Sequence, residues 1–249
     1  MKPESAVPPV LEMRDVEAAY GPFRALFDVS FHVDVGEAIG LLGANGAGKT
    51  AVARVASGLV PPSAGAVRVD GVDMSSESAY KFARAGVAHA PEGRSVLATF
   101  TVKENLELSF RRALGRRGVS SGLNRAFDLF PRLGERRNQL AGTLSGGEQR
   151  MLSLSRVLVE EPRLLIADEL SLGLAPIIVE EVYRILESIR EAGTSLLIVE
   201  QQITYALELC DRIVLLKHGR VDWEGPADNA QEIVTSRLFE HGSPDAPSS

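Results

Sequence analysis

The segment AIGLLGANGAGKT, residues 38–50, is the strongest indication of the fold class of this 249-residue chain. Its first five residues are an apolar, β-prone run, and the remaining eight match the pattern G-x-x-x-x-G-K-[ST]. Glycines in this pattern let backbone N–H groups turn around phosphate oxygens, and a helix that starts near Gly48 adds its positive end to the same anion. Lys49 supplies a point charge to the terminal phosphates, and the Thr50 hydroxyl is placed to ligate Mg²⁺. The segment therefore predicts a strand, a phosphate-binding loop and a helix.

The rest of the chain alternates short apolar runs with helical patterns, which is typical of a parallel sheet covered by helices. Besides residues 38–42, buried strands are expected at residues 86–90, 164–167, 195–199 and 213–216. Residues 65–69 and 219–223 are expected in an antiparallel portion with glycine turns. The predicted fold class is thus α/β, with a mostly parallel core sheet and an antiparallel β portion.

Residues from about 95 to 159 differ in character from the rest of the chain. They combine helical periodicity with many arginines, which we expect on a solvated face: Arg111, Arg112, Arg116, Arg117, Arg136 and Arg137. We interpret this stretch as a helical subdomain inserted into one α/β domain that spans residues 10–225. Residues 226–249 are expected to form a C-terminal helix and a disordered tail.

Two carboxylates end the apolar run at residues 164–169, which reads LLIADE. The C-terminal end of a strand faces the crevice in which α/β folds bind ligands. Asp168 is therefore suited to hold Mg²⁺, which prefers oxygen ligands and keeps its waters. Glu169 is then the candidate to orient and polarise an attacking water. Taken alone, the two acids also fit a solvated strand end, but the phosphate loop favours the catalytic interpretation.

The segment LSGGEQ at residues 144–149 predicts a second helix N-terminus that could bind an anion. Ser145 and Glu148 have the spacing of a capping box, and Gly146 and Gly147 leave the helix N-terminus open to a phosphate. The alternative is a helix that is simply well capped. We keep that alternative for residues 101–104, which have the same spacing without glycines.

Composition excludes several functions. Aspartate and glutamate outnumber lysine and arginine by 33 to 27, the opposite of a duplex-binding domain, so no nucleic-acid partner is expected. The single cysteine, Cys210, excludes an intrachain disulfide framework, and we expect it in the core. No apolar run approaches the ~18 residues that cross a bilayer, and residues 1–10 do not resemble a signal peptide. A function at a membrane would therefore need a separate chain that crosses it.

LSGGEQ ahead of LLIADE, behind a phosphate loop, resembles the ABC (ATP-binding cassette) ATPases, and the resemblance covers residues from about 10 to 225. It implies the P-loop NTPase fold, ATP and Mg²⁺ as ligands, and hydrolysis of ATP. It also implies a dimer in which the signature of one subunit closes on the γ-phosphate held by the other. The signature residues are Ser145, Gly146, Gly147, Glu148 and Gln149.

The resemblance assigns further positions one at a time. Tyr20 lies 29 residues before Lys49 (49 − 20), where the family has an aromatic side chain that stacks on adenine; the alternative is a core tyrosine. Glu92 stands where the family has a glutamine that ligates Mg²⁺. Gln201 replaces the switch histidine, so it could bond the γ-phosphate but not titrate. The residues expected to bind nucleotide are Tyr20, Gly43, Ala44, Asn45, Gly46, Ala47, Gly48, Lys49, Thr50 and Ala51.

Departures from the common family pattern indicate a branch. PEGR at residues 91–94, SLGLAP at 171–176 and VEQ at 199–201 resemble the ATP-binding subunit of branched-chain amino acid importers. Ala51 replaces a hydroxyl residue that contacts the α-phosphate, a loss expected to weaken nucleotide binding by about 1 kcal/mol.

The resemblance implies an ATPase subunit at the cytoplasmic face of a membrane. Its implied partners are integral-membrane permease subunits, a second copy or a paralogous ATPase subunit, and indirectly a solute-binding protein. One alternative is a soluble ABC ATPase not tied to transport, which would carry long coiled coils or zinc cysteines between its motifs. The first carboxylate lies only 119 positions after the loop lysine (168 − 49), and the chain has one cysteine. There is thus no room for a long coiled coil and no set of zinc cysteines, which opposes this alternative. The other alternative is a weakly active regulatory nucleotide-binding subunit. It is suggested by Ala51, by Gln201 and by Ala175, which stands where the family usually has an aspartate, but it is opposed by the presence of Glu169.

Overall fold

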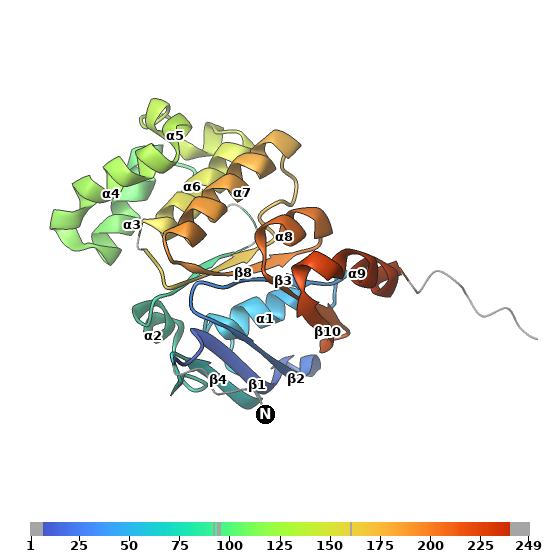
Figure 1. Ribbon diagram of the computed structural model, residues 1–249. Coiled ribbons are helices and arrows are strands. Elements are labelled where there is room, and N and C mark those ends of the chain that lie inside the picture. The colour runs from blue at the N-terminus through green and yellow to red at the C-terminus, as the bar shows by residue number, and fades with distance from the viewer. Residues whose placement is uncertain (1–6, 92, 94–95, 160, 240–249) are drawn as a thin grey trace, which may run out of the picture.

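A computed structural model describes residues 7–91, 93, 96–159 and 161–239 of the chain. In this part of the chain a six-stranded sheet, in the order β10-β9-β3-β8-β7-β6, forms the centre of the molecule (Figure 1). Its strands are β3 (Ala38–Leu42), β6 (Val87–Ala90), β7 (Leu164–Asp168), β8 (Ser195–Glu200), β9 (Arg212–Lys217) and β10 (Arg220–Pro226). Neighbouring strands run parallel except β9 and β10, which are antiparallel. The predicted mostly parallel core sheet is confirmed.

The five apolar runs of the sequence form β3 and β6 to β9, because a parallel sheet is covered on both faces. Alternate residues of one strand enter opposite cores. Leu42 and Ile198 pack in one cluster, whereas Leu41 and Leu197 pack in the other. Strands buried on both faces have few polar positions, and this made them readable as continuous apolar runs.

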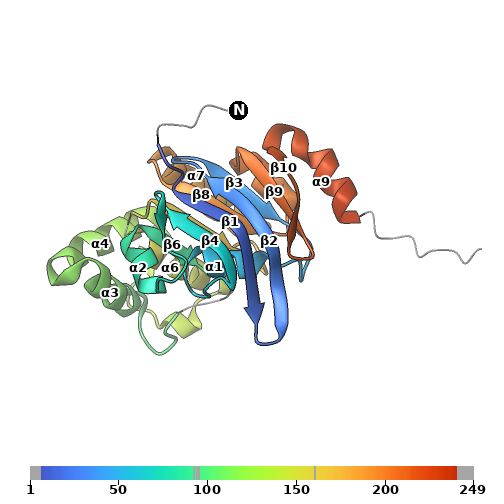
Figure 2. The same ribbon diagram turned by 90° about the horizontal axis from the view of Figure 1, so that it is seen from below.

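A separate antiparallel sheet has the order β2-β1-β4-β5. Its strands are β1 (Leu11–Tyr20), β2 (Phe23–Val33), β4 (Ala64–Val69) and β5 (Val72–Asp73). Helix α1 (Lys49–Ala56) lies between this sheet and the core sheet (Figures 1 and 2). The buried side chains of α1 join the same cluster as the inner faces of β1 and β2, so the helix is covered on both sides.

One expected strand lies in a different sheet from the predicted one. Residues 219–223 belong to β10, which pairs with β9 at the edge of the core sheet and takes no part in the separate antiparallel sheet. The reason is the turn between β9 and β10, where His218 has a φ of 49° and Gly219 a φ of 73°. Positive φ at both central residues is the geometry of a tight hairpin, so β10 must fold back onto β9.

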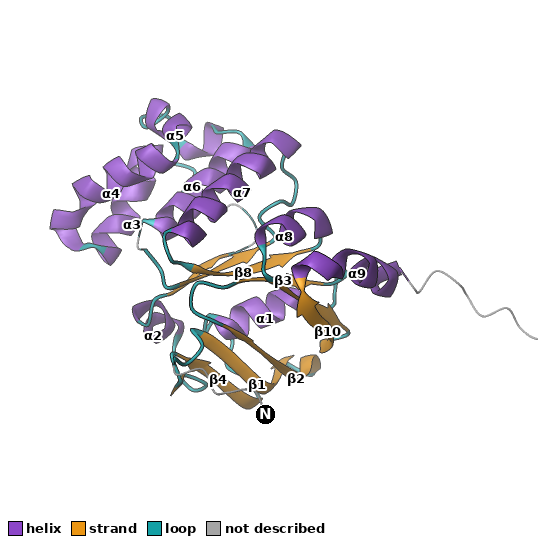
Figure 3. Ribbon diagram, in the orientation of Figure 1, coloured by secondary structure: helices purple, strands orange, loops and turns teal. Residues whose placement is uncertain are grey.

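Helices cover the core sheet on the side away from α1 (Figure 3). Between β6 and β7 the chain forms α3 (Val102–Ala113), α4 (Gly115–Leu129), α5 (Pro131–Glu135) and α6 (Gly146–Leu158). The arginines expected to be solvated in this stretch are all exposed. The remaining helices are α2 (Ala79–Arg84), α7 (Pro176–Glu191), α8 (Ile203–Leu209) and α9 (Ala230–Phe239), with 3-10 turns at Ala141–Thr143 and Ala227–Asn229. The tail at residues 240–249, expected to be disordered, lies outside the described residues.

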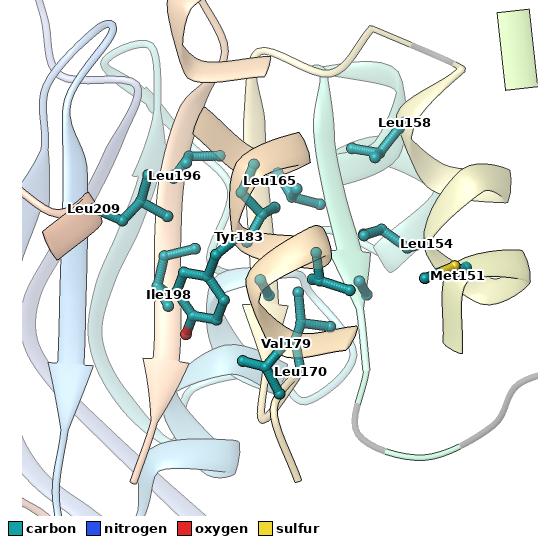
Figure 4. Close-up of a cluster of buried hydrophobic side chains, with 14 of the residues drawn as sticks. Met151, Leu154, Leu158, Leu165, Leu170, Val179, Tyr183, Leu196, Ile198 and Leu209 are labelled. Carbon is teal, nitrogen blue, oxygen red and sulfur yellow. The ribbon is translucent and has the colours of Figure 1, made fainter. Parts of the chain in front are cut away.

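Helices α6, α7 and α8 are fixed to the sheet by apolar packing. Figure 4 shows Met151 of α6, Leu165 of β7 and Tyr183 of α7 in one cluster. Cys210 is buried in the same cluster, and this burial raises the pKa of its thiol, so the residue packs as a small apolar side chain as expected. Within the described residues no helix is both long and apolar enough to cross a membrane.

Candidate active site

The phosphate loop joins the end of β3 to the start of α1. A Cβ atom on Gly43 would lie 2.5 Å from the backbone oxygen of Leu216, so a side chain there would push the loop off β9. Gly48, directly before α1, has a φ of 105°, a conformation that L residues rarely adopt. These two glycines allow the loop to curl so that the N–H groups at the start of α1 are available to an anion.

The turn between β9 and β10 is hydrogen-bonded to the phosphate loop. Gly219 N donates to Ala47 O over 2.8 Å, and Gly219 O accepts from Phe27 N over 2.8 Å. The loop is therefore tied to β2, which forms a hairpin with β1. Tyr20 ends β1 and is 38% exposed, so it lies at the surface and not in the core.

Lys49 brings the loop and the strand-end carboxylates into one site. The lysine is only 4% exposed, and its Nζ lies 3.0 Å from Gly43 O and 3.3 Å from Glu169 Oε1. Strands β3 and β7 both flank β8 in the sheet, so their C-terminal ends meet at the same edge. The structure thus joins two motifs that are 119 residues apart (168 − 49).

The backbone of Glu169 turns the carboxylate out of the strand. Its φ is 47°, an uncommon value for a residue other than glycine. Glu169 N donates to Val199 O of β8 over 2.8 Å, and Glu169 O accepts from Leu172 N over 3.3 Å. Such conformations cost free energy and persist where the surrounding contacts impose them, often at functional sites.

The oxygen donors at this edge fit Mg²⁺. Thr50 is the second residue of α1, and Asp168, 1% exposed, ends β7. A hydroxyl and a carboxylate are hard ligands, and Mg²⁺ completes its shell with water and phosphate oxygens. Among the described residues no group of three or more His, Cys, Asp or Glu side chains could hold a metal ion alone. Glu92, the third predicted ligand, lies outside the described residues.

Gln201 follows β8 with an exposed side chain, and its N–H donates to Glu200 Oε2 over 3.3 Å. The sequence did not single out Glu200, which is 2% exposed and accepts from both Ser171 N (2.9 Å) and Ser171 Oγ (2.7 Å). This carboxylate ties the segment after Glu169 to the segment that carries Gln201. Its only sequence signal is an acidic residue at the end of an apolar run.

The predicted capping box at the start of α6 is confirmed. Ser145 Oγ accepts from Glu148 N over 3.3 Å, and Glu148 Oε2 accepts from Ser145 N over 2.9 Å. Glu148 also pairs with Arg136, and Gln149 Nε2 donates to Ala141 O over 3.0 Å. The side chains of Glu148 and Gln149 are therefore occupied within their own subunit. Only the exposed Ser145 and the half-buried glycines after it are open to an incoming phosphate. The capping box at residues 101–104 is also present.

Helix α6 covers the face of the core sheet opposite to α1 (Figure 1). Helices α6 and α1 therefore lie in different layers of the fold.

A phosphate loop between a parallel strand and a helix, with its lysine beside a carboxylate of a nearby strand, defines a P-loop nucleotide hydrolase. The family described as ABC transporter matches residues 26–171, which is more than half of the chain. The chain belongs to this family and is an ATPase with the ATP-binding fold of ABC transporters.

Known proteins resemble the chain over most of its length. The high-affinity branched-chain amino acid transport ATP-binding protein BraG of Pseudomonas aeruginosa is 40% identical over 217 residues, 85% of this chain and 91% of BraG. The lipopolysaccharide export system ATP-binding protein LptB of Escherichia coli is 31% identical over 92% of this chain and 96% of LptB. A solved structure of the ATP-binding subunit of an ABC transporter has a TM-score of 0.79 and 28% identity, covering 92% of this chain and 94% of that chain.

Ala51 gives a first testable prediction. Its side chain is 4% exposed on α1, directly after Thr50. We expect Ala51→Thr to tighten ATP binding by up to about 1 kcal/mol, because the added hydroxyl can donate to the α-phosphate. The control is Ala51→Val, which adds similar volume to the core without a hydroxyl. Fluorescence titration with ATP should give a lower Kd for the threonine variant than for the valine variant, and equal values would contradict the prediction.

Proposed function

We propose that the chain energises the import of branched-chain amino acids through a separate membrane permease, at the cytoplasmic face of the membrane. The observation that carries this proposal is the 40% identity to BraG across 91% of that protein. The segments at residues 91–94, 171–176 and 199–201 add support, because their departures from the common family pattern resemble those of the importer branch. A solute-binding protein would deliver the amino acid to the permease.

The site supports in-line attack of water on a γ-phosphate. In this proposal Tyr20 stacks on adenine, and the phosphate loop with Lys49 holds the phosphates. Thr50 and Asp168, with Glu92, hold Mg²⁺, which neutralises charge on the phosphate oxygens when bound. The catalytic residues are Glu169 and Gln201. Glu169 polarises the attacking water, and the Gln201 amide donates to the γ-phosphate.

A second ATPase subunit, either a copy of this chain or a paralogue, would complete the site. Helices α6 and α1 lie on opposite faces of the core sheet, and in this proposal Ser145 and its glycines contact the γ-phosphate of the partner. Two large apolar side chains at and before the start of α7 support this arrangement, since Leu172 is 57% and Ile177 is 70% exposed. The next residue, Ile178, lies close to the α6 start, because a Cβ atom on Gly147 would be 2.9 Å from its side chain. Exposed apolar side chains of this size are typical of protein interfaces. Closure around ATP and reopening after hydrolysis would then move the permease.

The main alternative is that the chain energises export, because the relative LptB belongs to an export system. The decisive experiment reconstitutes the chain with its permease in vesicles and measures ATP hydrolysis together with uptake of radiolabelled leucine. Import predicts that solute-binding protein loaded with leucine stimulates both. Stimulation by a lipid substrate, with no response to leucine, would favour export instead.

Gln201 gives a prediction on pH dependence. Glutamine does not titrate, so we expect the hydrolysis rate to be nearly flat between about pH 6 and pH 8, apart from the ionisation of ATP itself. His89 does not interfere, because burial, with Arg54 nearby, lowers its pKa to about 4 and leaves it neutral over this range. Gln201→His should introduce a step with a midpoint near ~6.5.

The measurement is the rate of ATP hydrolysis against pH for both proteins, with the permease present. Gln201→Asn is the control, because it shortens the side chain without adding a titrating group. A steep step in the parent protein that the histidine leaves unchanged would remove Gln201 from the switch position.

A further inference from the structure

Arg150 of α6 makes contacts that the phosphate-binding and signature motifs do not require. The residue is 5% exposed, and its guanidinium donates to backbone carbonyls of two segments. Nη1 lies 3.0 Å from Pro91 O and 2.5 Å from Gly93 O. Nη2 lies 3.0 Å from Asp168 O and 2.6 Å from Glu169 O. One side chain therefore joins α6 to the segment after β6 and to the carboxylate pair at the end of β7.

The chemistry of arginine suits this junction better than that of another polar side chain. The guanidinium is planar and presents its N–H groups in a fixed fork, so four bonds set both the distance and the relative orientation of the carbonyls. Lysine would offer a single ammonium on a flexible stem, and glutamine would offer two donors. A buried cation costs free energy unless it is hydrogen-bonded, so the fold can bury this guanidinium only while it bonds to the backbone carbonyls.

The contacts of Arg150 stabilise an unusual backbone conformation at Glu169. The residue has a φ of 47°, and the peptide group before its Cα is fixed by the bond from Glu169 N to Val199 O. The peptide group after its Cα is fixed by the bonds that Glu169 O accepts from Arg150 Nη2 and Leu172 N. The carboxylate that results from this backbone turn lies 3.3 Å from Lys49 Nζ. Without the arginine, the unusual φ would lose one of the contacts that impose it.

We propose that Arg150 is a positioning residue for Glu169. It holds the Glu169 peptide in the left-handed conformation that directs the carboxylate toward the phosphates and the attacking water. Because Arg150 and the capping residue Ser145 belong to the same helix, the Glu169 peptide also follows any movement of the start of α6. The proposal rests on the catalytic role proposed for Glu169.

The test is steady-state ATP hydrolysis and ATP binding by Arg150→Gln. We expect kcat to fall by roughly 10- to 100-fold, because a misplacement of a catalytic group by about 1 Å costs up to about 100-fold. The KM and Kd for ATP should stay within about twofold of the parent, since the phosphate loop is untouched. Arg150→Lys, which keeps the charge but not the fork, should lie between the parent and the glutamine variant.

The matched control is Arg190→Gln at the far end of α7. Arg190 also bridges elements, because it donates to Leu209 O over 2.8 Å and to the Asp211 carboxylate over 2.5 Å. This variant should lower Tm while kcat stays at the parent value. It separates a general loss of stability from a loss of position at the site.

A double-mutant cycle separates the positioning role of Arg150 from the catalytic role of Glu169. If Arg150 acts through Glu169, Arg150→Gln should change the residual rate of Glu169→Gln by less than about twofold. Parent-like turnover by Glu169→Gln would refute the catalytic role of Glu169 itself. An inactive Glu169→Gln together with parent-like kcat in Arg150→Gln would overturn the positioning role alone. So would a loss of rate that is fully additive in the double variant, because it would show an effect that does not pass through Glu169.

Discussion

Glu169→Gln is expected to reduce the rate of ATP hydrolysis by at least ~100-fold while ATP binding is retained. Glutamine has nearly the same size and shape, so the backbone turn and its bonds to Val199 and Arg150 remain. The amide oxygen, however, is too weak a base to polarise water. The loss should therefore appear in kcat and not in the affinity for ATP.

The contact between Glu169 and Lys49 adds a second consequence. Glu169 Oε1 lies 3.3 Å from Lys49 Nζ, so the carboxylate competes with the phosphates for the ammonium. A negative charge beside the γ-phosphate also repels it. Removing this charge should tighten ATP binding, and a closed dimer should accumulate because hydrolysis no longer reopens it. Size-exclusion chromatography with ATP and Mg²⁺ should show a dimer peak for the variant that the parent protein lacks.

The control for this experiment is Glu180→Gln, which removes one carboxylate from an exposed position on α7. It should match the parent in rate and in elution volume. A Glu169→Gln protein that turns over at the parent rate would mean that another group polarises the water, and the assignment of Glu169 would have to be withdrawn.

The parts of the fold that follow from local rules could be predicted from the sequence. Strands β3 and β6 to β9 are covered on both faces, so they appear as continuous apolar runs. The capping boxes of α3 and α6 depend on residues three positions apart and were equally readable. The phosphate loop and the carboxylates at the end of β7 were found because each motif lies directly after such a run.

Other features depend on contacts that sequence spacing does not encode. Strands β1 and β2 alternate buried and exposed residues, and their pairing shifts register where Asp15 and Asp28 adopt positive φ. Their periodicity is therefore interrupted and the strands were not predicted. The place of β10 depends on a two-residue turn, which decides the sheet that the strand joins. Arg150 and Glu200 are charged residues whose partners are distant in the chain, so only the folded structure shows that they are buried.

Lys49→Ala is expected to weaken ATP binding by about 10- to 100-fold, because a charge-assisted contact to phosphate contributes ~1.5–3 kcal/mol. The effect should lie toward the upper end, since the substitution also leaves the Glu169 carboxylate facing the phosphates without its cation. Lys81→Ala, which removes an exposed ammonium on α2, is the control and should bind ATP like the parent.

The repulsion of the phosphates by the unpaired Glu169 carboxylate can be measured separately, because it comes from a single ion pair, with 3.3 Å between Lys49 Nζ and Glu169 Oε1. In the double variant Lys49→Ala with Glu169→Gln the unpaired carboxylate is gone, so part of the lost affinity should return. The Kd for ATP, measured by fluorescence titration, should therefore fall in the order Lys49→Ala, double variant, parent. If the single variant binds ATP like the parent, the loop at residues 43–50 is not the phosphate site. If the double variant binds no better than Lys49→Ala, the carboxylate does not face the phosphates, and Glu169 cannot act on water at the γ-phosphate from this position.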